Sequence, residues 1–290
     1  MPDPIAPLSA PLTDWVGRSE TADDQITAAP AVGLAATLDL PAQDWRDGDP
    51  LPPLWHWAYF LPRHRQSELG PDGHALRGGF LPPVPLPRRM WAGGRFVFIE
   101  PLRVGGAVRR VSRIEEVSEK SGRSGALVFV RVRHEIAQQV GGAWRPALTE
   151  EHDIVYREAP RAGAPVAAQQ PAPADAQFER TVLPDPVLLF RYSALTFNGH
   201  RIHYDRRWCQ QDEGYPGLVV HGPLQATLLA ELLRQHAPGR SLARFAFRAL
   251  RPLFDLAPFA VCGRIDGSAA RLWVRDAQGC ATMEATAELR

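Results

Sequence analysis

Alternating apolar and polar residues dominate several long segments of the chain. A period of two places apolar side chains on one face of a strand, so we expect these segments to be β-strands. The predicted strands are 108–119, 126–138, 148–157, 271–276 and 281–289. Short turns such as Ser121-Gly122 and Gly141-Gly142 separate neighbouring segments in the first half. Strands joined this closely pair side by side, so the pattern predicts a meander of long antiparallel strands.

A helical period marks residues 223–235. Pro223 stands at the first helical position, and Pro238-Gly239 follow the last turn. One face of the segment carries four leucines: Leu224, Leu228, Leu229 and Leu232. Proline at the start and glycine beyond the end are typical of a helix, so we expect a buried helix here.

Residues 22–38 predict a second, weaker helix in the first half of the chain. Thr21 or Asp24 would cap its start, and Pro30 interrupts it. Each half of the chain therefore offers one helix, and each also offers a set of strands. A sheet that curls around a single central helix, present twice, is the α+β arrangement that these elements predict.

The two halves also resemble each other in sequence. Arg-Phe-Val-Phe begins at Arg95 in the first half, and Arg-Phe-Ala-Phe begins at Arg244 in the second. With one gap of two residues, a Pro-Leu pair and an Arg-Ile pair downstream align as well. The match indicates a duplication, although short alternating strands also resemble one another by chance.

An alanine- and proline-rich segment divides the chain. Residues 161–176 offer few side chains to bury, which is typical of a linker. We therefore predict a first domain at 1–160 and a second domain at 177–290, joined by this linker. Residues 51–86 contain too much proline for a regular helix or a central strand. They are expected to form an aromatic covering segment, either a loop that closes the core of the first half or a wall of an acyl pocket.

The composition narrows the classes of partner and compartment. Lys and Arg number 33 against 32 Asp and Glu, so no global field attracts nucleic acid or an anionic membrane. No stretch of 18 apolar residues and no signal-peptide pattern is present, which argues against a membrane or export. Cys209, Cys262 and Cys280 are widely spaced and odd in number, so a reducing cytoplasm is the expected location.

Three residues of the second half carry the candidate chemistry. Adding water to a double bond conjugated to a thioester requires proton transfer and stabilisation of the enolate oxygen. His203 is the candidate general acid/base, because an imidazole changes its protonation near neutral pH. Asn198 would orient the water or the imidazole, since an amide cannot act as a base. Gly222 precedes Pro223 at the predicted helix start, where backbone N–H groups converge, and it is the candidate oxyanion donor.

Each of these features also has a purely structural interpretation. His203 alone is typical of a hydrogen-bonded structural histidine, and Asn198-Gly199 alone is an ordinary turn signal. A metal site was the further alternative, because several ligand types lie nearby: His200, His203, Asp205 and His221. A His-x-x-His pair on a loop without a cysteine or acidic cluster is a weak match, so we predict no metal. Arg191 or Arg201 would bind a substrate carboxylate or a phosphate of coenzyme A.

The second half resembles the MaoC-type hydratases, whose signature is roughly Asp-x-Asn-Pro-Ile-His followed by His-Gly. Ile202-His203 and His221-Gly222 fit that pattern. Asn198 stands where the family usually has its catalytic aspartate, and His200-Arg201 replace Asn-Pro. The resemblance implies a hot-dog fold, and the departures put the usual Asp/His dyad in doubt.

Two longer segments resemble one subgroup of that family. Residues 190–205 and 79–93 are similar to the fused double hot-dog hydratases and dehydratases that act on mesaconyl-C4-CoA, itaconyl-CoA and 3-hydroxyacyl thioesters. The resemblance implies a catalytic second half and a first half that shapes the acyl pocket. It implies a hydro-lyase for a short branched dicarboxylic enoyl-CoA, with coenzyme A as part of the substrate and no other cofactor.

Two alternatives remain beside this function. One is a dehydratase for medium or long 3-hydroxyacyl thioesters, and the other is a non-catalytic acyl-thioester-binding protein. The residues assigned to substrate binding are Arg191, Arg201, Tyr192 and His221. A chain with two hot-dog units satisfies the usual pairing internally, so either a monomer or a homodimer is expected.

Overall fold

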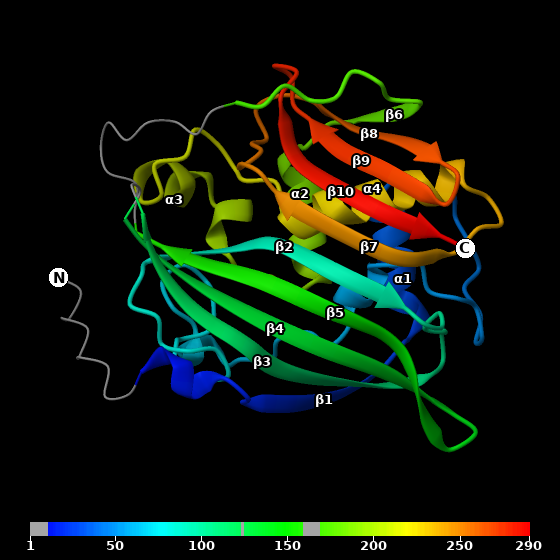
Figure 1. Ribbon diagram of the computed structural model, residues 1–290, viewed down its shortest axis with the longest axis horizontal. Coiled ribbons are helices and arrows are strands. Elements are labelled where there is room, and N and C mark those ends of the chain that lie inside the picture. The colour runs from blue at the N-terminus through cyan, green and yellow to red at the C-terminus, as the bar shows by residue number, and fades with distance from the viewer. Residues whose placement is uncertain (1–10, 123–124, 159–168) are drawn as a thin grey trace.

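A single antiparallel sheet of ten strands forms the body of the molecule (Figure 1). The computed structural model describes residues 11–122, 125–158 and 169–290. Along the sheet the strands follow the order β1-β3-β4-β5-β2-β7-β10-β9-β8-β6. Their bounds are β1 Ser19–Gln25, β2 Arg88–Phe98, β3 Ala107–Gly122, β4 Gly125–Val140, β5 Ala143–Arg157, β6 Phe178–Val182, β7 Leu242–Ala249, β8 Phe259–Asp266, β9 Ala269–Arg275 and β10 Ala281–Leu289.

The order of the strands repeats from one half of the sheet to the other. Strands β1 to β5 lie on one side and β6 to β10 on the other, each set in the same relative order about the centre. At the centre, β2 pairs with β7, and Phe96 stands opposite Phe245. The two Arg-Phe-x-Phe sequences therefore meet at the join between the halves. The α+β double hot-dog fold expected from the sequence is confirmed.

Helix α4, Gly222–His236, is the buried central helix of the second half. Ten of its residues are buried, and it contacts β8, β9 and β10. The leucine face predicted from the period supplies its core contacts, with Leu224, Leu228 and Leu232 almost fully buried. The other helices are α1 Ala28–Thr37, α2 Pro186–Leu195 and α3 Arg206–Gln211, with 3-10 turns η1 Leu12–Trp15, η2 Trp55–Ala58, η3 Gln66–Glu68 and η4 Arg201–His203. No helix in the described part of the chain is long and apolar enough to cross a membrane.

The helix predicted at 22–38 is wrong in its first part. Residues 19–25 form the edge strand β1, which pairs with β3 and places Asp23 against Arg109. The helix α1 begins only at Ala28. Pro30 is its third residue, where a backbone N–H has no partner within the helix, so proline is tolerated in this first turn instead of interrupting it.

The covering segment, residues 51–86, contributes side chains to two apolar clusters, of which the larger is shared by both halves. Leu54 and Trp55 enter the main core, and Val84 enters a second cluster beneath β3, β4 and β5. The expectation of a covering loop is therefore confirmed. In the predicted linker, Ala172 and Ala176 pack against the outer cluster of the second half. Residues 161–168 lie outside the described part of the chain.

Candidate active site

The turn after α2 carries the first group of predicted residues. Asp185 caps α2 by accepting the N–H of Leu188, and Pro186 stands in the first turn. The helix ends at Leu195, and Phe197 follows with a φ of 49° in the left-handed region. This reversal of the chain brings Asn198 back to the helix, where its N–H donates to the Ser193 carbonyl at 2.8 Å. The sequence analysis missed α2, although the Asp-Pro pair at its start is a helix signal.

His203 lies at the end of η4 with one ring nitrogen committed. Its Nδ1 lies 2.7 Å from the Val219 carbonyl, which can only accept, so Nδ1 carries the hydrogen and Nε2 has the lone pair. The residue is 7% exposed. Burial lowers the pKa of His203 to about 4, although the Val219 carbonyl opposes this shift. At neutral pH the ring is therefore an uncharged base.

The ring of His221 packs against the ring of His203. The two rings stack with centroids 3.7 Å apart and an angle of 18° between their planes. The Nε2 atom of His221 lies 2.8 Å from the hydroxyl of Ser193 on α2. His221 is fully buried, and burial lowers its pKa well below the ordinary value. A charge on this ring is therefore strongly disfavoured. His221 is a neutral ring against which His203 packs.

The N-terminus of α4 follows directly after His221. The first intrahelical bond runs from the Gln225 N–H to the His221 carbonyl, and Pro223 has no N–H. The N–H groups of Gly222 and Leu224 are the donors left at this helix end. Gly222 is half-buried, and a Cβ added there would make an ordinary van der Waals contact with Met283 Cε at 3.9 Å, so no neighbouring atom crowds this residue. Because His203 stacks on the residue that precedes Gly222, the base and the helix N-terminus lie side by side.

The other predicted residues occupy less direct positions. Asn198 Oδ1 accepts the His200 N–H at 3.0 Å and so shapes its own turn. Tyr192 is buried beside His221, with ring centroids 5.0 Å apart. Arg201 pairs with Asp205 at 2.7 Å and stacks on Trp208.

Arg191 is the one predicted arginine that points to solvent. It lies on α2 and is exposed, while its neighbour Tyr192 is buried. The structure therefore brings His203, His221, Asn198 and Gly222 together and leaves Arg191 at the surface.

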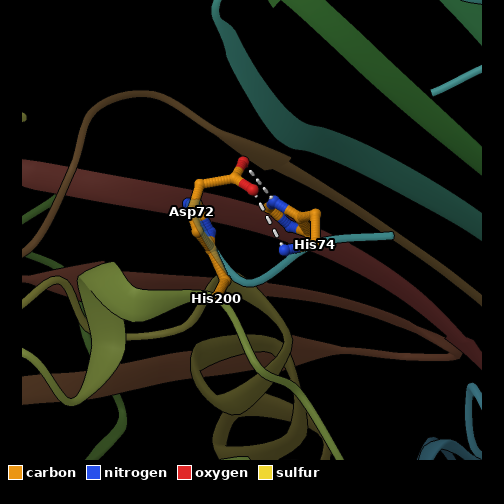
Figure 2. A group of neighbouring side chains, drawn as sticks. All are labelled: Asp72, His74 and His200. Atoms are coloured by element: carbon orange, nitrogen blue, oxygen red, sulfur yellow. Dashed lines mark hydrogen bonds and ion pairs between the residues drawn. The ribbon is translucent and has the colours of Figure 1, made fainter. Parts of the chain in front are cut away.

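Two residues of the covering segment complete the site, and the sequence analysis did not single them out. Asp72 and His74 lie beside His200 (Figure 2). The Asp72 carboxylate accepts from His74 twice, from Nδ1 at 2.9 Å and from the backbone N–H at 3.0 Å. The His74 and His200 rings are 4.0 Å apart, and the His200 and His203 rings are 5.4 Å apart. His74, His200, His203 and His221 form the site cluster, a continuous row of imidazoles.

Backbone contact docks the covering segment on the turn at residues 196–203, which is called the catalytic turn below because it carries His203. The Arg201 N–H donates to the Asp72 carbonyl at 2.9 Å. A Cβ at Gly73 would lie 1.8 Å from the Gly199 carbonyl oxygen, so only glycine allows this approach. Gly73 also has a φ of 86°, a conformation that other residues rarely adopt. The sequence signal for this turn is Pro-Asp-Gly at 71–73.

The side chains that lie close enough to share a metal ion differ from the four that the sequence analysis considered as metal ligands. Within the described ranges, Asp72, His74 and His200 bring one ligand atom each within 4.8 Å of one another. Of the four residues considered from the sequence, only His200 belongs to this group. Asp205 is engaged by Arg201 and caps α3 through the Trp208 N–H. Both Asp72 oxygens already accept from His74, so the carboxylate is committed to the imidazole.

An uncharged imidazole base beside a helix N-terminus, within a double hot-dog, is the arrangement of the acyl-thioester hydratases and dehydratases. The chain belongs to the family described as hydroxyacyl-thioester dehydratase type 2, which it matches over residues 54–255. It is 51% identical over 284 residues to a mesaconyl-C(4)-CoA hydratase of Chloroflexus aurantiacus, covering 97% of this chain and 99% of that protein.

More distant relatives agree with this family. A mitochondrial hydroxyacyl-thioester dehydratase type 2 of Schizosaccharomyces pombe is 27% identical over 248 residues, covering 77% of this chain and 80% of that protein. Among solved structures, a MaoC-like dehydratase from Phytophthora capsici superposes with a TM-score of 0.68 at 13% identity. That match covers 96% of this chain and 97% of the other, and it shows the shared fold.

Proposed function

We propose that this protein is a hydro-lyase that adds water reversibly to the double bond of an enoyl-CoA. His203 is the general acid/base, and the observation that carries the proposal is its ring stacked on His221 beside the N-terminus of α4. As the water oxygen bonds to the β-carbon, Nε2 of His203 takes one proton of the water. The electrons of the double bond move onto the thioester oxygen. The same nitrogen then returns the proton to the α-carbon, which restores the thioester and the neutral ring.

The N-terminus of α4 stabilises the enolate in this scheme. The Gly222 N–H donates to the thioester oxygen, and the missing side chain lets that oxygen approach. The positive end of the helix dipole favours the charge that collects there. A single donor of this kind contributes about 3 to 4 kcal/mol to transition-state stabilisation in other enzymes. Asn198 remains the candidate for holding the water or the thioester through its amide.

A short branched dicarboxylic acyl group, as in mesaconyl-C4-CoA or itaconyl-CoA, is the proposed substrate. The identity of 51% to a mesaconyl-C(4)-CoA hydratase supports this choice. In mesaconyl-C4-CoA the second carboxylate is attached to the reacting β-carbon, so it needs a cation beside the site. Arg89 on β2 is half-buried, and no ion pair among the described residues involves it, whereas its neighbour Arg88 pairs with Glu213.

The electrostatics favour Arg89 over the two arginines considered first. Burial is the largest cause of the lowered pKa of His74 and His200, and the charge of Arg89 adds to the lowering in both. Arg89 therefore acts on the site cluster. Arg201 is already paired with Asp205, and Arg191 is exposed. Arg89 is the arginine that we assign to the distal carboxylate.

A dehydratase for longer acyl chains is the second candidate function, and one feature favours it. An apolar-walled cavity of about 980 Å³ lies near the far end of α4, between Trp45, Trp55 and Leu233. A cavity of this size is within the range that holds drug-sized ligands. A long acyl chain that reached it from Gly222 would have to follow α4 past Ala230.

Coenzyme A enters as part of the substrate, and the proposal includes no metal or redox cofactor. We place the protein in the cytoplasm, because its three cysteines are free and buried. The pairing of β2 with β7 joins the two halves inside one chain, which supports a monomer or a homodimer of such units.

A panel of enoyl-CoA esters tests the function. Hydration is followed by loss of the conjugated thioester absorbance, with mesaconyl-C4-CoA, crotonyl-CoA and a long-chain 2-enoyl-CoA. We expect kcat/KM to be highest for mesaconyl-C4-CoA. Arg89→Gln should lower that value about tenfold or more and change crotonyl-CoA hydration little, because only the first substrate carries the second carboxylate. Arg191→Gln on the surface is the matched control.

The outcomes separate the alternatives. Faster turnover of the long-chain substrate would establish the second candidate. A protein that binds these esters and hydrates none of them would be a binding protein, and the enzymatic proposal would fail.

A further inference from the structure

The attacking water has two O–H groups, and the proposed mechanism accounts for only one of them. His203 Nε2 accepts the proton that is transferred. The second O–H needs an acceptor that fixes the direction of the water lone pair toward the β-carbon. Asn198 is the residue predicted for this task, but its Oδ1 is held in its own turn by the His200 N–H at 3.0 Å, which occupies one of its two lone pairs. The NH2 group of its amide can only donate, so a second acceptor beside the site would fix the water more firmly.

His74 has the properties of this second acceptor. The Asp72 carboxylate can only accept, so the hydrogen of His74 lies on Nδ1 and the lone pair lies on Nε2. Burial lowers the pKa of His74 to about 4, and Arg89 and Arg77 add to this effect while Asp72 opposes it. His74 therefore keeps its Nε2 lone pair at neutral pH. Its side chain is still 20% exposed, so a small molecule can reach the ring.

Ring packing and backbone contacts of the covering segment hold His74 at the site. It packs on His200, which meets His203 edge to face. The covering segment is bonded through Asp72 to Arg201, two residues from His203, and the contact of Gly73 with Gly199 admits no side chain. Figure 2 shows the Asp72 carboxylate turned toward His74, with His200 next to both.

We propose that the Asp72–His74 pair, contributed by the first half of the chain, holds the attacking water in this hydro-lyase. This rests on the proposed function. His74 is a catalytic residue in this scheme, because its Nε2 accepts the O–H that is not transferred. Asp72 is a positioning residue that fixes the tautomer of His74. In the hydration step one O–H of the water breaks to His203, the oxygen bonds to the β-carbon, and the other O–H stays intact on the product hydroxyl, still bonded to His74.

The same geometry accounts for the asparagine at position 198. The family that the second half resembles usually has an aspartate at that position. Here Asp72, from the first half, supplies a carboxylate that reaches the site cluster through the imidazole of His74. The two halves of the chain therefore share one site.

Three variants test the pair by steady-state hydration kinetics. His74→Phe keeps a ring against His200 and removes the acceptor. Asp72→Asn can retain the bond to the His74 backbone N–H while placing an N–H against Nδ1, which moves the ring hydrogen to Nε2. Each should lower kcat about 10- to 100-fold, with KM and the Kd of a saturated acyl-CoA analogue within about threefold of wild type. The double variant should be no slower than His74→Phe, because Asp72 acts through His74.

The control and the contrary outcomes are specific. His64→Phe changes an exposed histidine of the same covering segment and should leave kcat unchanged. The proposal is overturned if His74→Phe retains wild-type kcat, if the two single losses multiply in the double variant, or if analogue binding weakens as much as kcat falls. Dependence of wild-type turnover on added Zn²⁺ after chelation would make the three residues a metal site and also overturn it. If His203→Gln abolishes hydration and His74→Phe does not, the proposed function stands and only this inference fails.

Discussion

Two groups of histidines in this protein differ in the hydrogen-bond partners of their rings. In one group the partners suit a structural role, and in the other they suit the proposed catalytic role. The Glu150 cluster, formed by Glu150, His56, His152 and His134, lies inside the first half. Glu150 is 2% exposed. Its carboxylate accepts a hydrogen bond from the Trp57 indole N–H at 2.8 Å, and it is also hydrogen-bonded to His56 at 2.9 Å and to His152. His152 contacts His134, which meets the Ser112 hydroxyl at 2.8 Å.

The pKa of Glu150 shows how this cluster is neutralised. Burial alone would raise it, but the charges and hydrogen bonds of His152 and His56 hold it well below the ordinary value. The carboxylate is therefore ionised at the centre of a closed set of donors. Such a group stabilises one arrangement of β3, β4, β5 and the covering segment, and it has little capacity left for a ligand.

The site cluster is built the other way. The Asp72 carboxylate lies at one end of the cluster and, among the residues that the structure describes, accepts hydrogen bonds from His74 alone. His203 and His221 have neutral partners, the Val219 carbonyl and the Ser193 hydroxyl. Burial without a counter-charge keeps these rings neutral and leaves lone pairs unused. Free hydrogen-bonding capacity, more than burial itself, distinguishes the cluster that we propose to be reactive.

His203→Gln should have the largest effect on catalysis. Loss of the general acid/base lowers kcat/KM for enoyl-CoA hydration by about 10³-fold, which is about 4 kcal/mol in the barrier. Stability should change little, because no ion pair is broken. His134→Gln in the Glu150 cluster is the matched variant, and it should retain kcat. Equal losses of kcat in both variants would erase the distinction between the two clusters.

Glu150→Gln should have the opposite signature. Removing the buried charge leaves His56 and His152 without their anion and lowers the free energy of unfolding by about 3 kcal/mol. Folded protein should still turn over at the wild-type kcat, because Glu150 belongs to the closed cluster. Denaturant unfolding and steady-state kinetics on the same preparation measure the two quantities. An unchanged stability would mean that the closed network is not what holds the first half together.

The pH dependence of stability sharpens the comparison further. Burial lowers the pKa of His203 to about 4 in the folded protein, while the unfolded value is about 6.5. Between these values the unfolded chain binds more protons, so this contribution is complete above pH 6.5 and is lost as the pH falls toward 4. The loss is on the order of 3 kcal/mol, because little of the ring is exposed to solvent. The unfolding free energy of His203→Gln should change less between pH 7 and pH 5 than that of the wild type. An equal change in both proteins would contradict the lowered pKa of His203.

Gly73→Ala should have the smallest effect. The added Cβ would meet the Gly199 carbonyl, so the covering segment must move away from the catalytic turn. We expect kcat to fall about tenfold, and the free energy of unfolding to fall by about 1 kcal/mol, because alanine is strained at a φ of 86°. Gly79→Ala in the same segment, where a Cβ meets nothing within 4 Å, is the control. Wild-type turnover in Gly73→Ala would show that this docking is dispensable.

Sequence reasoning found what depends on local periodicity and missed what depends on contacts between the halves. The leucine face predicted α4 to within a residue at each end, and alternation located β4 and β10 closely. The edge strand β1 was taken for helix because its partner β3 is far away in the sequence. His203 and Gly222 share a local motif and could be singled out. Asp72 and His74 are about 130 residues from the turn that they contact, and only a turn signal marks them.

A structure of the protein with a saturated or hydrated acyl-CoA bound would show whether the acyl group lies between His203 and the start of α4. We expect the thioester oxygen about 3 Å from the Gly222 nitrogen and the β-carbon substituent within hydrogen-bonding reach of His203 Nε2. An acyl group seated instead in the cavity beside Trp45 and Trp55, with nothing at Gly222, would contradict this expectation.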